Sequence, residues 1–130
     1  MNIKEIKVLV VDDEADFRQL LVFWLQSKGY SVVTAVNGSN AVQVVKDEAP
    51  DIVFMDLRMP VMDGIEAIKN IRAFNQDVPI IIISAYVDDT NARTAFSYGI
   101  SGVFYKDKDF EEGLYLLESA LRTHKKLKSK

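Results

Sequence analysis

The sequence contains no cysteine, one histidine and three prolines among its 130 residues. The absence of cysteine excludes disulfide scaffolds and metal centres built on thiolate ligands. The longest strongly apolar runs, Val8–Val11 and Val78–Ile83, are far shorter than the roughly 20 residues of a membrane-spanning helix. Met1–Lys7 also lacks the pattern of a signal peptide. We therefore expect one cytosolic globular domain, because a chain of this length can bury a sufficient core without covalent cross-links.

Charge is distributed unevenly along the chain. The net charge is −3, but residues 122–130 contain five basic side chains and no acidic one. Residues 1–121 therefore hold 11 basic and 19 acidic side chains and carry −8. Such an acidic body is a poor binder of nucleic acid. The basic tail at residues 122–130 is interpreted as a frayed helix end, a solubility feature or the start of a linker.

Short runs rich in Val and Ile alternate with segments of helical periodicity, which is typical of βα units around a parallel sheet. We predict strands at Lys7–Val11, Ser31–Ala35, Ile52–Asp56, Val78–Ser84 and Gly102–Tyr105, and helices at Ala15–Lys28, Ser39–Glu48, Gly64–Phe74, Asp89–Tyr98 and Phe110–Lys125. Right-handed crossovers then place helices on both faces of the sheet, giving a doubly wound α/β fold with three α/β/α layers. The continuous apolar runs Val8–Val11 and Ile80–Ile83 indicate central strands, and the more polar Ser31–Ala35 indicates an edge strand.

Polar side chains stand at the predicted carboxyl ends of the strands, where open parallel sheets bind ligands. These residues are Asp12 and Asp13 after the first strand, Asp56 at the end of the third, Ser84 at the end of the fourth and Lys106 after the fifth. Three carboxylates held together repel one another and need a compensating cation. Oxygen ligands without His or Cys favour Mg²⁺, Mn²⁺ or Ca²⁺, and a site with room for water and phosphate favours Mg²⁺.

A carboxylate beside a metal ion can attack phosphorus and form an aspartyl phosphate. With strands about 4.8 Å apart, Lys106 starts roughly 10 Å from the third strand, and a long side chain can meet a phosphoryl group between them. Each acid taken alone also fits a helix N-cap, and Lys106 alone fits a solvated loop residue. The joint pattern, more than any single residue, indicates a site.

Four segments resemble the receiver domain of two-component response regulators, and the resemblance covers nearly the whole chain. The matching segments are Val8-Leu-Val-Val-Asp-Asp-Glu14, Asp51-Ile-Val-Phe-Met-Asp-Leu-Arg-Met-Pro-Val-Met-Asp-Gly64, Ile80-Ile-Ile-Ile-Ser-Ala85 and Lys106. The stretch from Asp56 to Gly64 is the most specific of them. The resemblance implies one receiver domain over residues 1–130 and the flavodoxin-like strand order 2-1-3-4-5, for which chemotaxis receivers are a standard example.

The resemblance also implies a role for each site residue. Asp56 would be the phosphoacceptor, Asp13 would bind Mg²⁺ directly, Asp12 would bind it through water, the backbone carbonyl of Arg58 would be a further ligand, and Lys106 and Ser84 would contact the phosphoryl oxygens. The donor would be a histidine on a sensor kinase or a phosphotransfer protein. The chain's own His124, in the basic tail, is expected to be a solvated residue and no internal donor.

The implied function is a phosphorylation-dependent signalling switch that catalyses only its own phosphorylation and dephosphorylation. Movement of Ser84 would alter the surface formed by the fourth helix, fifth strand and fifth helix, where a downstream protein or an output domain would bind. No output domain is visible in the sequence. We expect a monomer or a weak dimer through that surface, with no direct binding to nucleic acid or membrane.

Three departures from the family pattern bear on this function. Val103 replaces the usual aromatic residue three positions before Lys106, and the partly exposed Tyr105 is interpreted as a packing residue. Asp107 replaces the usual cis-proline, so we predict a trans bond and a reshaped loop. The bulky Arg58 and Tyr86 are predicted to flank the path of the hydrolytic water and to slow loss of the phosphoryl group.

Other functional classes fit less well. A receiver-like interaction module that works without phosphorylation is the alternative if Val103 and Asp107 uncouple the site from the surface. A Mg²⁺-dependent phosphatase is disfavoured because Arg58 stands where such enzymes carry a second Asp. A flavodoxin is disfavoured because its first loop would be rich in Ser, Thr and Gly, whereas this chain has Asp-Asp-Glu.

Overall fold

The computed structural model describes residues 6–85 and 90–124. Within these ranges the chain alternates between parallel strands and helices. The strands are β1 (Lys7–Val11), β2 (Ser31–Ala35), β3 (Ile52–Asp56), β4 (Ile80–Ser84) and β5 (Gly102–Tyr105). The helices are α1 (Ala15–Ser27), α2 (Gly38–Glu48), α3 (Gly64–Phe74), α4 (Thr90–Phe96) and α5 (Phe110–Thr123). The strand order β2-β1-β3-β4-β5 is the doubly wound order that the family resemblance implied.

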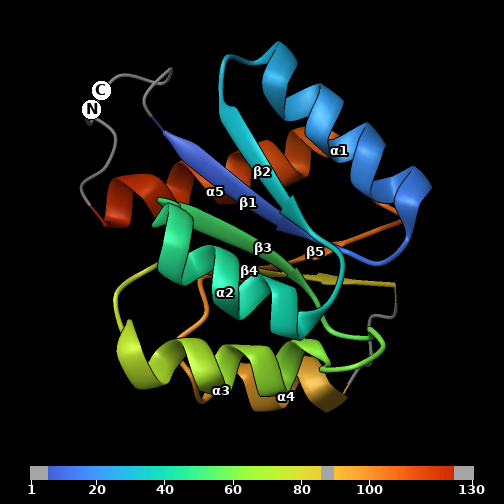
Figure 1. Cartoon of the computed structure of the whole chain (residues 1–130). Helices are drawn as coiled ribbons and strands as arrows, with labels where there is room; N and C mark the ends of the chain where they lie inside the picture. The colour runs from blue at the N-terminus through green and yellow to red at the C-terminus, as the bar shows by residue number, and fades with distance from the viewer. Residues whose placement is uncertain (1–5, 86–89, 125–130) are drawn as a thin grey trace.

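Helices cover both faces of the sheet, which confirms the three-layer prediction (Figure 1). Helices α1 and α5 pack on one face, where Leu21 and Leu117 join a buried cluster with Phe54 of β3. Helices α2, α3 and α4 pack on the other face, where Ile68 and Ala95 join a second buried cluster. Both apolar layers are thus separated by the sheet, and polar groups at its carboxyl edge lie between the two helical layers.

The predicted positions of the strands in the sheet are confirmed. β1 lies between β2 and β3, β4 lies between β3 and β5, and β2 forms one edge. Every residue of β3 and β4 is buried, as expected for strands covered on both faces. The prediction that the fourth strand begins at Val78 was wrong, because it begins at Ile80. Pro79 has no N–H to give to a neighbouring strand, although its carbonyl still accepts from Val53 N at 3.0 Å.

Three helices begin at side-chain caps. Asn37, Asp63 and Asp109 each accept a hydrogen bond from the backbone N–H three residues later, at the starts of α2, α3 and α5. Glu14 is the N-cap residue of α1 and makes no such cap. The predicted start of the fourth helix at Asp89 lies outside the described residues. None of the helices that the structure describes is long and apolar enough to cross a membrane.

Candidate functional site

The predicted site residues meet at the carboxyl edge of the sheet. Strand register places Asp56 of β3 beside Ile83 of β4, and Ser84 beside Tyr105 of β5. The backbone N–H of Lys106 donates to the carbonyl of Ser84 at 2.9 Å. The ends of β3, β4 and β5 are therefore held in line by ladder hydrogen bonds, and their polar side chains point to a common region.

Three aspartates form one cluster at this edge. Carboxylate oxygens of Asp12, Asp13 and Asp56 all lie within 4.8 Å of one another. Asp12 is fully buried and Asp56 is only 6% exposed, whereas Asp13 is exposed. Burial is the main reason that the pKa of Asp56 rises to about 7, with the charge of Asp12 and a hydrogen bond to it adding to the rise, while Lys106 opposes it. The cluster thus concentrates negative charge that its own residues do not neutralise.

Backbone amides orient the two buried carboxylates. Asp12 Oδ1 accepts from the N–H of Glu14 at 2.9 Å, and Asp56 Oδ1 accepts from the N–H of Arg58 at 3.4 Å. Asp12 Oδ2 is buried and receives no hydrogen bond of good geometry from the described part of the chain, although Lys106 Nζ lies 3.0 Å away as an ion pair. Neither Asp12 nor Asp13 caps a helix, so the simple capping interpretation does not hold for them.

Lys106 brings a positive charge to the cluster. Its Nζ lies 2.9 Å from Glu14 Oε1, 3.0 Å from Asp12 Oδ2 and 3.6 Å from Asp56 Oδ2, and its side chain is 18% exposed. Burial alone would lower the pKa of Lys106, but its contacts with Glu14 and Asp12 and the charge of Asp56 outweigh it and raise the pKa. The side chain is therefore a protonated cation shared among three carboxylates. It is no solvated loop residue.

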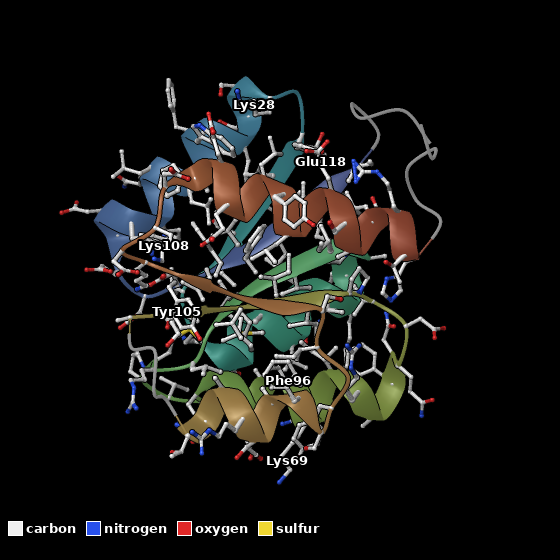
Figure 2. All side chains as sticks on the ribbon, turned by 180° about the vertical axis from the view of Figure 1, so that it is seen from behind. Lys28, Lys69, Phe96, Tyr105, Lys108 and Glu118 are labelled. Atoms are coloured by element: carbon white, nitrogen blue, oxygen red, sulfur yellow. The ribbon has the colours of Figure 1, made fainter. Side chains whose placement is uncertain are left out.

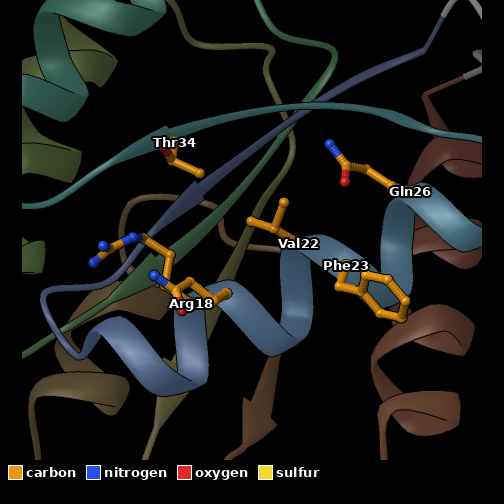
Figure 3. Close-up of a pocket in the computed structure, with 6 residues that line it drawn as sticks. Arg18, Val22, Phe23, Gln26 and Thr34 are labelled. Atoms are coloured by element: carbon orange, nitrogen blue, oxygen red, sulfur yellow. The ribbon is translucent and has the colours of Figure 1, made fainter.

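A cavity of about 410 Å³ opens beside these groups. It is lined by Asp13, Glu14, Asp56, Leu57, Arg58, Ile83, Ser84, Ala85 and Lys106. The structure thus brings Ser84 and Arg58 to the same cavity as Asp13, Asp56 and Lys106. Tyr86 lies outside the described residues. A second cavity of about 320 Å³, between α1 and Thr34 of β2, is lined by no acidic residue (Figure 3).

The donor set fits a hard divalent cation. Three carboxylates converge, and one buried oxygen, Asp12 Oδ2, has no hydrogen bond from the described residues to satisfy it. Carboxylate and carbonyl oxygens without nitrogen or sulfur are the ligands that Mg²⁺ prefers. A cation here would also offset the repulsion that raises the pKa of Asp56.

Two of the departures from the family pattern, Val103 and Asp107, lie on and directly after β5. The Lys106–Asp107 bond is trans, as predicted, because the described residues contain no cis peptide bond. The loop instead turns tightly, with Lys108 N donating to Tyr105 O at 3.0 Å. Val103 is half-buried and packs against the α2–α3–α4 core. Tyr105 is also half-buried, in agreement with its interpretation as a packing residue.

The histidine lies far from the acidic cluster in the fold. His124 is exposed, and its Nδ1 lies 2.9 Å from the carbonyl oxygen of Ala120. It lines a cavity of about 400 Å³ with Asp51, which precedes β3, and Val78, which precedes β4. That cavity is at the amino ends of the strands, opposite the site, so His124 is not placed to serve Asp56.

Sequence reasoning missed one participant, Glu14. Its carboxylate accepts a hydrogen bond from Lys106 across 92 residues of sequence. Glu14 stood inside the first matching segment, but no periodicity or spacing connects it with Lys106. The contact arises only when β1 and β5 are assembled into one sheet.

The fold and this cluster together define a phosphorylation-based signalling module. The family model for the response regulator receiver domain matches residues 8–118, and the chain belongs to this family. It is 36% identical over 121 residues to the transcriptional regulatory protein ZraR of Klebsiella oxytoca, a match that covers 93% of this chain and 27% of that protein. It is 32% identical over 123 residues to sporulation initiation phosphotransferase F of Bacillus subtilis (strain 168), covering 95% of this chain and 96% of that protein.

Solved structures show the same fold. The receiver domain of NtrX from Brucella abortus has a TM-score of 0.84 and 29% identity, covering 89% of this chain and 98% of that one. Chemotaxis response regulator CheY4 of Vibrio cholerae has a TM-score of 0.83 and 30% identity, with the same coverage of 89% and 98%. The chain spans about a quarter of the length of the curated transcriptional regulators that it matches.

Proposed function

We propose that this domain is a phosphorylation-dependent switch of a two-component phosphorelay in which Asp56 is the phosphoacceptor. The observation that carries the proposal is the position of the Asp56 carboxylate. It lines the 410 Å³ cavity, clusters with two further aspartates, and lies 3.6 Å from the ammonium of Lys106. An acid in this setting has a cation beside it and space in front of it for a phosphoryl group.

The proposed transfer begins when a carboxylate oxygen of Asp56 attacks the phosphorus of a phosphohistidine on a sensor kinase or phosphotransfer protein. The new P–O bond forms as the P–N bond breaks, and its electron pair stays on the imidazole nitrogen, which takes up a proton from solvent. Lys106 pairs with the phosphoryl oxygens, and Ser84 donates a hydrogen bond to one of them. These contacts stabilise the charge that develops during transfer.

Asp12, Asp13 and Asp56, with the backbone carbonyl of Arg58, would hold Mg²⁺ in this site. When bound, the ion neutralises negative charge on the transferred group and on the aspartates. The buried Asp12 Oδ2, which receives no hydrogen bond from the described residues, and the pKa of Asp56, which stays raised although Lys106 lowers it, support this assignment.

Phosphorylation of Asp56 would alter the surface formed by α4, β5 and α5, where a partner would bind (Figure 2). Ser84 ends the strand next to β5, so its movement toward a phosphoryl group acts on the edge of this surface. Phe96 of α4 is 57% exposed and Tyr115 of α5 is 69% exposed, and aromatic residues of this kind are enriched in protein interfaces. A downstream protein, an output domain or a second copy in a weak dimer would bind here.

The proposal is tested by incubating the domain with Mg²⁺ and acetyl phosphate and measuring intact mass. Wild type should gain one phosphoryl group, and Asp56→Asn should gain none. Omission of Mg²⁺ should abolish the gain. If wild type gains nothing under any of these conditions, the domain is instead an interaction module that acts without phosphorylation.

A further inference from the structure

The ammonium of Lys106 lies nearer to Glu14 and Asp12 than to Asp56. Its Nζ donates a hydrogen bond to Glu14 Oε1 at 2.9 Å and forms an ion pair with Asp12 Oδ2 at 3.0 Å. The same Nζ lies 4.9 Å from the centre of the Phe17 ring, in the first turn of α1, in a cation–π contact. Asp56 Oδ2 is the most distant of its three acidic neighbours, at 3.6 Å, which is beyond the length of a good charge-assisted hydrogen bond.

Glu14 and Asp56 both attract the ammonium of Lys106, and Glu14 is the nearer of the two. Movement of the ammonium toward a phosphoryl group on Asp56 would lengthen its contact with Glu14, which is now the shortest of its ion pairs at 2.9 Å. Glu14 also lines the cavity, so its carboxylate adds negative charge where an anionic phosphodonor would enter. Its side chain is 60% exposed and makes no capping hydrogen bond, although Glu14 is the N-cap residue of α1.

We infer that Glu14 is a positioning residue that holds Lys106 away from the accepting oxygen and thereby restrains phosphorylation of Asp56. The inference rests on the proposed function, because it concerns the regulation of that same site. Glu14 acts through Lys106 and does not touch the transferred group.

The direct test compares Glu14→Gln with wild type in the rate of phosphoryl gain from acetyl phosphate at saturating Mg²⁺ and low salt. Because an ion pair this exposed is weak, the expected acceleration is modest, roughly three- to tenfold. The matched control is Asp16→Asn, which removes one exposed acid from the first turn of the same helix and should leave the rate near that of wild type. Glu14→Asp should restore part of the restraint. High salt should narrow the difference between Glu14→Gln and wild type.

Two further measurements separate a role through Lys106 from a general effect of charge. In a Lys106→Gln background, Glu14→Gln should produce no more acceleration than Asp16→Asn does. The ¹⁵N signal of the Lys106 ammonium should shift in unphosphorylated Glu14→Gln and stay unchanged in Asp16→Asn. This second readout does not depend on phosphorylation.

The outcomes distinguish failure of the inference on Glu14 from failure of the proposed function. If wild type is phosphorylated but Glu14→Gln is no faster, or if its Lys106 signal does not move, the inference on Glu14 is overturned and the proposed function stands. Equal acceleration by Asp16→Asn also overturns it. If wild type gains no phosphoryl group at all, the proposed function fails and takes this inference with it.

Discussion

A Cβ atom on Gly64 would lie 2.2 Å from the carbonyl oxygen of Asp56. The first residue of α3 therefore sits directly against the backbone of the proposed phosphoacceptor, and the N–H of Gly64 donates to Leu57 O at 2.9 Å. The chain leaves the site after β3 and returns to it at the start of α3. The absence of a side chain at Gly64 is what allows the return.

Gly64→Ala should be strongly destabilising, because the atoms it meets are backbone and cannot rotate away. We expect a loss of about 2–3 kcal/mol in free energy of unfolding, measured by urea denaturation. Gly102→Ala is the matched control, since its Cβ would meet only the end of the Leu116 side chain at 3.2 Å. Similar losses in the two variants would contradict this reading of Gly64.

The pKa of Asp56 predicts how stability depends on pH without divalent cations. Its pKa is about 7 in the folded protein, against 3.8 for an ordinary aspartate, so the folded state binds the proton more tightly. Asp56 should therefore destabilise the fold progressively as pH rises from about 4 to about 7. Asp56→Asn should remove this loss and be more stable than wild type at pH 8 by a few kcal/mol.

Urea unfolding in a chelator at pH 5, 6, 7 and 8 measures this effect. The advantage of Asp56→Asn should shrink steadily toward pH 5, because wild-type Asp56 is then protonated in the folded state. Asp16→Asn should show no such trend. A stability difference that is the same at all four pH values would rule out Asp56 as the titrating group.

Mg²⁺ should stabilise the wild-type fold through the aspartate cluster. For a single site, an ion concentration 100-fold above Kd adds about 2.7 kcal/mol, which thermal melts with and without Mg²⁺ can detect. Asp13→Asn should lose most of this gain while keeping its stability in chelator, because Asp13 is exposed. Asp16→Asn should respond to Mg²⁺ as wild type does. Equal gains in wild type and Asp13→Asn would place the ion elsewhere.

Arg58 should slow the loss of the phosphoryl group from Asp56. Its side chain is exposed and lines the cavity, where it can block the approach of water. Arg58→Asn should therefore speed decay of the aspartyl phosphate several-fold, or about 1 kcal/mol in barrier. Arg58→Met keeps the bulk and should decay as slowly as wild type. Decay is followed by intact mass after removal of the donor, and an unchanged rate in Arg58→Asn would contradict the blocking role.

Much of this architecture follows from patterns that are local in the chain. Apolar runs such as Ile80–Ile83 identify buried strands because both faces of a parallel sheet are covered. Asp56 and Lys106 could be assigned to one edge because parallel strands all end on the same side. The start of β4 was less predictable. Pro79 has no N–H to donate to a neighbouring strand, and the strand begins at the next residue, Ile80.

The burial and the contacts of each charged side chain could not be predicted from local sequence patterns. Asp12 and Asp13 are adjacent and chemically identical, yet one is fully buried and the other exposed. The Asp12 N–H still bonds to Ala35 O of β2 at 3.2 Å, so Asp12 continues the extended chain of β1, where successive side chains point to opposite sides.

The sequence patterns thus predicted the α/β class and the acidic edge of the sheet, and the family resemblance supplied the strand order; Glu14 was not predicted to join the site. The sequence could not show that Lys106 rests against Glu14, or that the buried oxygen of Asp12 receives no hydrogen bond from the described residues. Those facts depend on side chains brought together from strands that are distant in sequence. Their energies are set by burial and by three-dimensional distance, which no local pattern encodes.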